Sequence, residues 1–119
     1  MKTNKYLIYY NTFSSIKELL STYPGLKLPQ LIVFGAIIAI SEHNSVVSQY
    51  DVTLLNTGIN KALSKSTTQR HINRLESEGF IVKTKNPQYF SRSYITLTKE
   101  GLLLKSRLSS LLNRAIPNS

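Results

Sequence analysis

The sequence predicts a mostly α fold with a small β-hairpin, an α+β arrangement within a single domain of residues 1–119. Apolar residues recur at helical spacing in several segments, two short β-forming segments flank a polar loop within 80–98, and a further helical stripe follows. A chain of 119 residues suffices for one hydrophobic core and is short for two. We expect an N-terminal arm and helix at 1–27, a central unit at 28–97 and a C-terminal helix at 98–119.

The first helix is expected to begin near Ser15, which with Glu18 three residues later has the form of a capping box. A tyrosine-rich lead-in precedes it, and Pro24-Gly25 marks the turn after it. The apolar residues that follow Ser15 have helical spacing, and they are Ile16, Leu19, Leu20 and Tyr23.

A second helix should start around Pro29, since proline suits the first helical position. Residues 31–40 are apolar on nearly every side, which predicts the buried centre of the domain, and an end near Asn44. The polar segment 45–51 fits either a short strand or an extended connection. Asp51 is the expected cap of a third helix that continues towards residue 63.

The clearest helix signal begins at Ser66, a capping residue, and ends at Gly79. One stripe of this segment is suited to a core and consists of Thr68, Ile72 and Leu75. The opposite face is polar and carries Gln69, Arg70, Asn73 and Arg74. Such a helix packs with one side and presents hydrogen-bonding groups with the other.

The hairpin is predicted from the β-forming residues at 80–85, the polar loop opened by Asn86-Pro87 and the alternating segment 94–98. Thr98 is then placed to cap a last helix. That helix has a wide apolar stripe formed by Leu104, Leu108, Leu111, Leu112 and Ala115.

Positive charge is concentrated in the middle of the chain. The sequence has 15 Lys and Arg against 6 Asp and Glu, a formal charge of +9. Residues 1–60 carry four bases and three acids, whereas residues 61–92 carry seven bases and two acids. The asymmetry favours a polyanionic partner over a merely lysine-rich surface, although charge alone does not separate nucleic acid from an anionic membrane.

Several function classes find no support in the sequence. There is no cysteine, and two histidines with scattered acids do not form a recognisable metal-ligand spacing. No nucleophile elbow, phosphate-binding loop, dinucleotide fingerprint or paired-carboxylate motif is visible, so we predict neither an enzyme nor a cofactor. The longest apolar run, 31–40, is about half of what spans a bilayer, and no signal-peptide pattern occurs, which predicts a cytoplasmic protein without membrane partners.

This order of elements is typical of a winged helix-turn-helix, in which one helix enters a DNA major groove about 12 Å wide and the hairpin makes a second contact. Between Leu28-Pro29-Gln30 and Thr98-Lys99-Glu100-Gly101 the sequence resembles the MarR family of winged-helix regulators, most strongly in the string from Ser66 to Ile81. The resemblance implies a dimer that binds a pseudo-palindromic operator, usually as a repressor that is sometimes relieved by a small molecule. The sequence itself does not indicate such an effector.

Candidate DNA-binding residues lie on the basic helix. Hydroxyls at Ser66 and Thr67 would sit at its N-terminus, where a phosphate is favoured, although Ser66 alone also fits simple capping. Gln69 suits an adenine edge and Arg70 a guanine edge. Arg74 is expected on phosphate, the alternative being a solvated ion pair with a neighbouring glutamate. The further candidates are Asn73 on the same face, Lys61 and Lys65 ahead of it, and Lys83, Lys85 and Arg92 in the hairpin.

The chain ends are expected to form a homodimer interface, because the last helix lies beyond the hairpin, where a single small domain has little remaining apolar surface to cover it. The residues assigned to this interface are Ile16, Leu19, Leu20, Leu104, Leu108, Leu111 and Leu112. The leading hypothesis is a sequence-specific transcriptional regulator of double-stranded DNA. The alternatives are a DNA-binding accessory protein of a plasmid or phage, acting in transfer, replication or nucleoprotein assembly, and a protein-interaction domain whose basic face is incidental.

Overall fold

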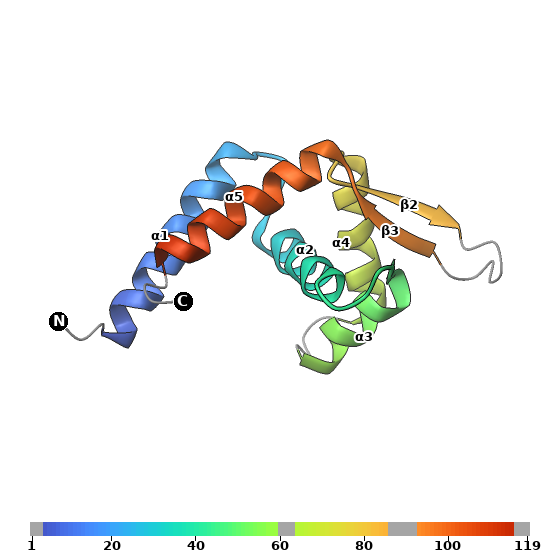
Figure 1. Cartoon of the computed structure of the whole chain (residues 1–119), viewed down its shortest axis with the longest axis horizontal. Helices are drawn as coiled ribbons and strands as arrows, with labels where there is room; N and C mark the ends of the chain where they lie inside the picture. The colour runs from blue at the N-terminus through green and yellow to red at the C-terminus, as the bar shows by residue number, and fades with distance from the viewer. Residues whose placement is uncertain (1–3, 60–63, 86–92, 116–119) are drawn as a thin grey trace.

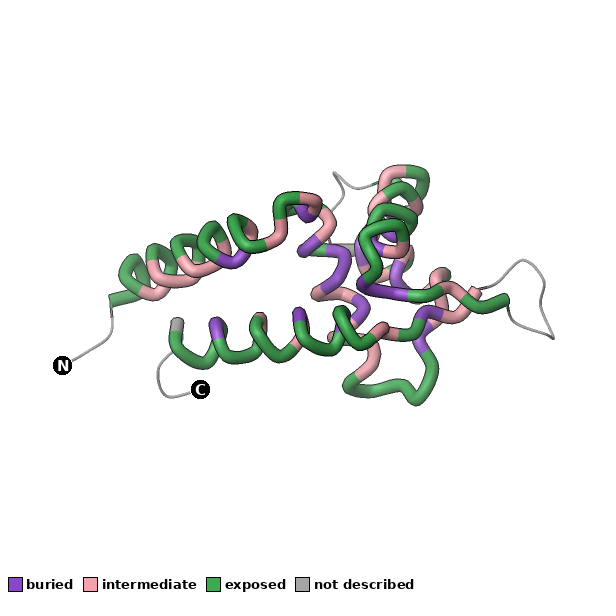
Figure 2. The backbone as a smooth tube through the Cα atoms, turned by 90° about the horizontal axis from the view of Figure 1, so that it is seen from above, coloured by how far each residue is buried: buried purple, intermediate pink, exposed green. Residues whose placement is uncertain are grey.

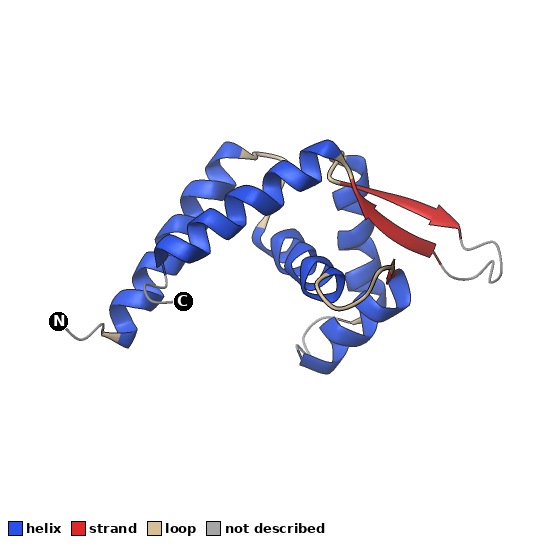
Figure 3. Cartoon of the chain, viewed as in Figure 1, coloured by secondary structure: helices blue, strands red, loops and turns tan. Residues whose placement is uncertain are grey.

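Five helices and three short strands follow one another in the computed structural model, which describes residues 4–59, 64–85 and 93–115 (Figure 1). They are α1 (Lys5–Thr22), α2 (Leu28–Ser41), β1 (Val47–Ser48), α3 (Gln49–Ile59), α4 (Lys65–Ser77), β2 (Ile81–Lys85), β3 (Ser93–Leu97) and α5 (Lys99–Ala115). The prediction of a mostly helical α+β fold with a hairpin is confirmed (Figure 3).

Three predicted helix starts are wrong. α1 begins at Lys5, capped by Asn4, whose side-chain oxygen accepts the Tyr6 N–H at 2.8 Å. The capping-box form at Ser15 therefore lies inside this helix, because the tyrosine-rich lead-in is itself helical. α3 begins at Gln49 rather than after Asp51, and α4 begins at Lys65 rather than after Ser66. In each case a polar side chain upstream of the predicted cap provides the actual one.

The sheet has the order β1-β3-β2, with both pairs antiparallel. The uncertain segment 45–51 contains a strand, since Val47 pairs with Ile95 and Ser48 with Tyr94. The hairpin pairs Ile81 with Leu97 at its base. Adding β1 to the hairpin ties the start of α3 to the sheet.

The core lies mainly where α2, α3, α4 and the sheet meet, and Figure 2 shows most of the buried, purple segments of the tube in that region. Phe34 and Ile37 of α2 are almost fully buried, as the apolar run predicted. Ile72 and Leu75 of α4 pack into the same core. Further buried members come from the other elements and include Val52, Ile81, Ile95 and Leu104.

Two glycines determine how α4 ends and α5 begins. Gly79 has φ +87°, a left-handed conformation that ends α4, as predicted. Gly101 lies so close to the Phe80 carbonyl oxygen that an added Cβ would come within 2.0 Å of it. The Thr98 hydroxyl accepts the Gly101 N–H at 3.0 Å, which confirms Thr98 as the cap of α5. The start of α5 therefore sits directly on the backbone that follows α4.

α1 and α5 run in opposite directions beside each other and project from the core as a two-helix arm (Figure 1). The arm contributes to the elongated dimensions of 54 × 27 × 25 Å. Its base is joined to the core by Tyr23, whose ring meets that of Phe80 edge-on at 5.5 Å and whose hydroxyl accepts an Arg107 N–H at 2.7 Å. Among the described helices, none combines the length and the apolar character needed to cross a bilayer.

Candidate nucleic-acid interface

α4 has one buried face and one solvent face. Thr68, Ile72 and Leu75 are fully buried, as the sequence predicted. The predicted polar candidates occupy the rest of the helix: Lys65, Ser66, Arg70, Asn73 and Arg74 are exposed, and Thr67 and Gln69 are half-buried. The structure thus brings seven of the predicted site residues onto one helix surface.

The N-terminus of α4 is rich in hydroxyl groups. Ser64 caps the helix, accepting the Thr67 N–H at 3.1 Å, and its hydroxyl lies 3.2 Å from that of Ser66. Because Ser64 satisfies the backbone, the Ser66 hydroxyl is not the cap and is exposed. With Lys65 exposed beside them, these groups lie at the positive end of the helix dipole, which favours an anion.

Two arginines extend along the exposed side of α4. Arg70 donates to the Thr67 hydroxyl at 3.3 Å, a contact that bends its side chain back towards the helix N-terminus. Arg74 forms an ion pair with Glu78 at 3.2 Å, and its side chain is 53% exposed. An exposed i,i+4 pair of this kind is worth only about 0.3–0.5 kcal/mol. A phosphate could therefore take over the Arg74 guanidinium at little energetic cost.

Side chains of α4 and β2 tie the helix to the hairpin. The Lys83 ammonium donates to the Asn73 side-chain oxygen and lies 3.7 Å from a Glu76 carboxylate oxygen. The other Glu76 oxygen accepts the Lys83 backbone N–H at 2.8 Å. Glu76 thus contacts both the side chain and the backbone of Lys83. These contacts fix the position of β2 relative to α4.

The remaining predicted hairpin and linker residues divide into two groups. Lys85, at the outer end of β2, is exposed and extends the positive surface beyond Lys83. Lys61 and Arg92 lie outside the described residues. Lys83 and Lys85 are two residues apart on β2, so both lie on the face of the strand whose Lys83 contacts α4.

His71 has a positioning contact. The Gln30 side-chain oxygen accepts the Lys27 N–H at 2.9 Å, so its amide nitrogen is the end that faces His71 and donates to Nδ1 at 2.8 Å. This bond needs a neutral ring with its proton on Nε2. Burial, and secondly the charge of Arg70, lower the pKa of His71 below its ordinary value. The start of α2 is thereby hydrogen-bonded to the middle of α4.

Gln49 is a site residue that the sequence did not reveal. Its amide nitrogen donates to the Gln69 side-chain oxygen, joining the first turn of α3 to the outward face of α4. The two residues are twenty positions apart, and only the angle between the helices brings them together. The serine-rich run from Ser64 to Thr67 was, by contrast, a visible signal that offered more than one cap.

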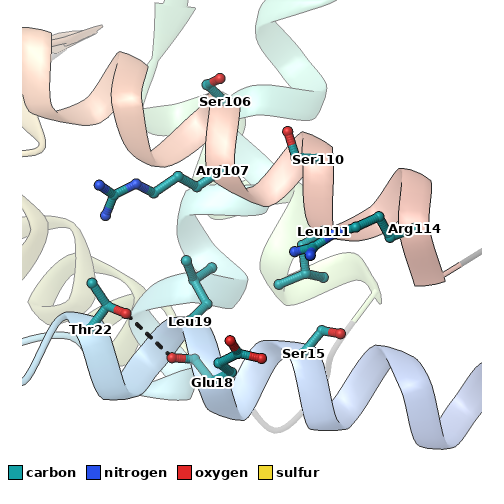
Figure 4. Close-up of a pocket in the computed structure, with 9 residues that line it drawn as sticks. All are labelled: Ser15, Glu18, Leu19, Thr22, Ser106, Arg107, Ser110, Leu111 and Arg114. Carbon is teal, nitrogen blue, oxygen red and sulfur yellow. Dashed lines mark hydrogen bonds between the residues drawn. The ribbon is translucent and has the colours of Figure 1, made fainter.

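The arm contains a pocket of about 430 Å³ between α1 and α5 (Figure 4). Leu19 and Leu111 lie on opposite sides of it, and Arg107 and Arg114 of α5 also line it (Figure 4). Leu19, Leu104 and Leu111 are buried by the chain's own helices, contrary to the expectation that little surface was left to cover them. These three leucines therefore pack within one chain and offer little surface to a second one.

No protein-family model matches this sequence, and no curated protein matches it either. Solved structures do match. A variant of MarR from E. coli complexed with operator DNA has a TM-score of 0.64 at 15% identity, covering 92% of this chain and 72% of that chain. A variant of S. aureus MepR bound to an oligodeoxyribonucleotide has a TM-score of 0.65 at 20% identity, covering 96% and 79%. The present chain has a MarR-like winged-helix fold.

A third solved structure, the PcaV transcriptional regulator of Streptomyces coelicolor with its natural ligand, has a TM-score of 0.57 at 25% identity and covers 95% of this chain and 75% of that chain. In the MarR-like fold of the present chain, α3 and α4 form the helix-turn-helix and β2 and β3 form the wing. The resemblance seen in residues 28–101 therefore identified the correct fold.

Proposed function

We propose that this protein is a sequence-specific regulator of transcription that binds double-stranded DNA as a dimer, as a repressor, and that it acts by binding rather than by catalysis. One observation carries the proposal: α4 buries one face in the core while its other face presents Gln69, Arg70, Asn73 and Arg74 to solvent. An α-helix held in this way fits a major groove. Similar folds from E. coli and S. aureus carry DNA in their solved structures.

Each part of the surface has a role suited to its chemistry. The hydroxyls and Lys65 at the start of α4 would bind phosphate, while Gln69 and Arg70 would read base edges. Arg74, Lys83 and Lys85 extend the positive charge along the helix and hairpin, and with Lys61 and Arg92 they would follow the backbone or the minor groove. A protein with this role would work in the cytoplasm beside its DNA.

The dimer would form through the part of the arm that one chain leaves uncovered. The exposed apolar side chains that we assign to this surface are Tyr6, Leu7, Tyr9, Tyr10 and Phe13 of α1 and Leu112 near the end of α5. A cluster of this kind marks an interaction surface. Ile16, Leu20 and Leu108 are partly buried beside it and would complete the contact. A two-fold arrangement of two arms would place the α4 helices about 34 Å or a multiple apart, matching a pseudo-palindromic site.

The salt dependence of binding to duplex DNA tests the proposal. Each phosphate neutralised by a lysine or arginine should add about 0.9 to the slope of log affinity against log salt concentration. We expect a steep slope in fluorescence anisotropy, together with footprints that cover two half-sites. A flat salt response, or DNA left unprotected, would contradict DNA binding. Protection without sequence preference would instead favour an accessory role in nucleoprotein assembly.

A further inference from the structure

We propose that Gln49 is a specificity-positioning residue: it orients Gln69 so that the two glutamines together read an adenine in the major groove. The inference rests on the proposed DNA binding and deepens it. Gln49 is the first residue of α3, and its side-chain nitrogen donates to the side-chain oxygen of Gln69 on α4. Arg70, the other predicted base-reading side chain, instead contacts Thr67 of its own helix.

The position of Gln49 is well determined by its neighbours. β1 ends at Ser48, which pairs with Tyr94 of β3, so the chain enters α3 directly from the sheet. The Ser48 hydroxyl accepts the Asp51 N–H at 3.0 Å and thereby caps the helix. Gln49 itself is half-buried, and its backbone carbonyl accepts the Thr53 hydroxyl. The backbone that carries Gln49, the donor of the glutamine pair, is therefore held by the sheet and by the first turn of α3.

Gln69 stands at the solvent side of the pair. It is half-buried and lines a shallow hollow at the start of α4 together with Ser64, Lys65 and Ser66. This hollow faces outward among the groups assigned to phosphate. Once the neighbouring hydroxyls bind the DNA phosphates, a side chain at the edge of this hollow would lie close to a base.

The chemistry of the carboxamide explains the adenine preference. An adenine edge needs a donor for N7 and an acceptor for the N6 amino group, which one glutamine supplies as a bidentate pair. A carboxamide oxygen has two lone pairs, so the bond from Gln49 occupies one and leaves the capacity for the N6 amino group. The Gln69 nitrogen keeps its donors for N7. Pairing also restricts a long side chain that otherwise loses rotamer entropy when a base fixes it.

The test uses a duplex selected from a randomised library by the full-length wild-type chain, together with duplexes carrying single base-pair changes. Affinities are measured for wild type, Gln49→Ala, Gln69→Ala and the double variant. Gln69→Ala should lower the preference at one A·T pair about tenfold, in keeping with the loss of a bidentate contact. Gln49→Ala should lower the preference about threefold or more at that same pair and at no other, and the double variant should match Gln69→Ala alone.

Gln49→Glu sharpens the test because its carboxylate accepts but does not donate. It would bind the Gln69 nitrogen, turn the amide round and present the oxygen, so the preferred base at that pair should change rather than merely weaken. Ser66→Ala is the matched control on α4, and it should weaken all duplexes alike. Thermal unfolding of each variant separates a folding defect from a change in base preference.

The outcomes are distinct. If no duplex is enriched and binding is independent of salt, the proposed function falls and this inference with it. If a site is enriched but Gln49→Ala weakens every duplex equally, or leaves the profile unchanged, the positioning role alone is wrong. Additive losses in the double variant, or a wild-type preference retained by Gln49→Glu, would also overturn it.

Discussion

The winged-helix core and the two-helix arm differ in how far their apolar side chains are buried. In the core, Phe34, Ile37 and Ile72 are buried by neighbouring elements of the same chain. Along the arm, Tyr6 is 70% exposed and Tyr10 66% exposed, and Figure 2 shows α1 as mostly exposed or intermediate. The hydrophobic core is therefore buried within one chain, whereas α1 carries a row of apolar side chains that a single chain leaves exposed.

This difference separates stability from assembly. The rings of Tyr9 and Phe13 on α1 meet at a tilt with centroids 4.5 Å apart, and neither residue belongs to the buried core cluster. The core alone presents the exposed side of α4, which is the proposed DNA-binding face. The arm, in the proposed dimer, sets how far apart two such sides lie.

The largest effect is expected from a core truncation. Phe34→Ala should lower the free energy of unfolding by about 3–5 kcal/mol, since it removes a fully buried aromatic ring and leaves a cavity. The matched change in the arm, Phe13→Ala, should lower it far less, because that ring is 48% exposed. Urea denaturation at one protein concentration measures both. Equal losses would show that the arm is part of the folding core.

A charge on the arm should act on assembly. Leu112→Glu should weaken dimerisation by about 2–3 kcal/mol, because it replaces an apolar contact with a carboxylate that must be desolvated. Ile32→Glu on α2 is the control, since Ile32 is also exposed but belongs to the core region. Sedimentation equilibrium should show a monomer for the first variant and a dimer for the second. A monomeric wild type would remove the arm from consideration as an interface.

The residues proposed to face DNA should separate into base-reading and backbone-binding classes. Arg70→Ala should lower affinity for the preferred site by about 1–3 kcal/mol and relax one base pair, whereas Lys85→Ala should weaken all sequences alike. Arg70→Lys keeps the charge but loses the planar fork, so it should retain general affinity and still relax the same pair. Equal losses on selected and random duplexes would make Arg70 a phosphate contact.

The smallest effect concerns pH. The folded-state pKa of His71 lies below its ordinary value of 6.5, so between those two values the unfolded chain binds more protons. Stability should be unaffected by His71 above 6.5, fall as the pH falls towards the folded-state pKa, and then level off for this group. DNA affinity should fall at lower pH, around the folded-state pKa, where the ring of the folded protein is protonated and the Gln30 bond is lost. His71→Leu should flatten this step, and an unchanged step would assign it elsewhere.

The order of elements and the two faces of α4 could be predicted from the sequence, because periodicity, Gly79 and Thr98 are local signals. The start of α1 was missed because its tyrosines carry a weak helical pattern, and Ser64 was missed because Ser66 is an equally suitable cap by residue type. Contacts between elements, such as Lys83 with Asn73, depend on how the helices and strands are oriented. The burial of Leu111 likewise depends on α5 packing beside α1, with Leu19 on the other side of the pocket between them.

The direction of α5 depends on the close backbone contact at Gly101, in the first turn of the helix. The Phe80 carbonyl accepts the Thr98 N–H at 3.1 Å and leaves no room for a side chain at Gly101, so the direction of α5 is set by backbone against backbone. A helix of 17 residues is about 25 Å long, and a tilt of about 10° at its base moves its far end by about 4 Å. A single methyl group at Gly101 would clash with the Phe80 carbonyl and tilt α5. In the proposed dimer this tilt would change the half-site spacing without altering any residue proposed to face DNA.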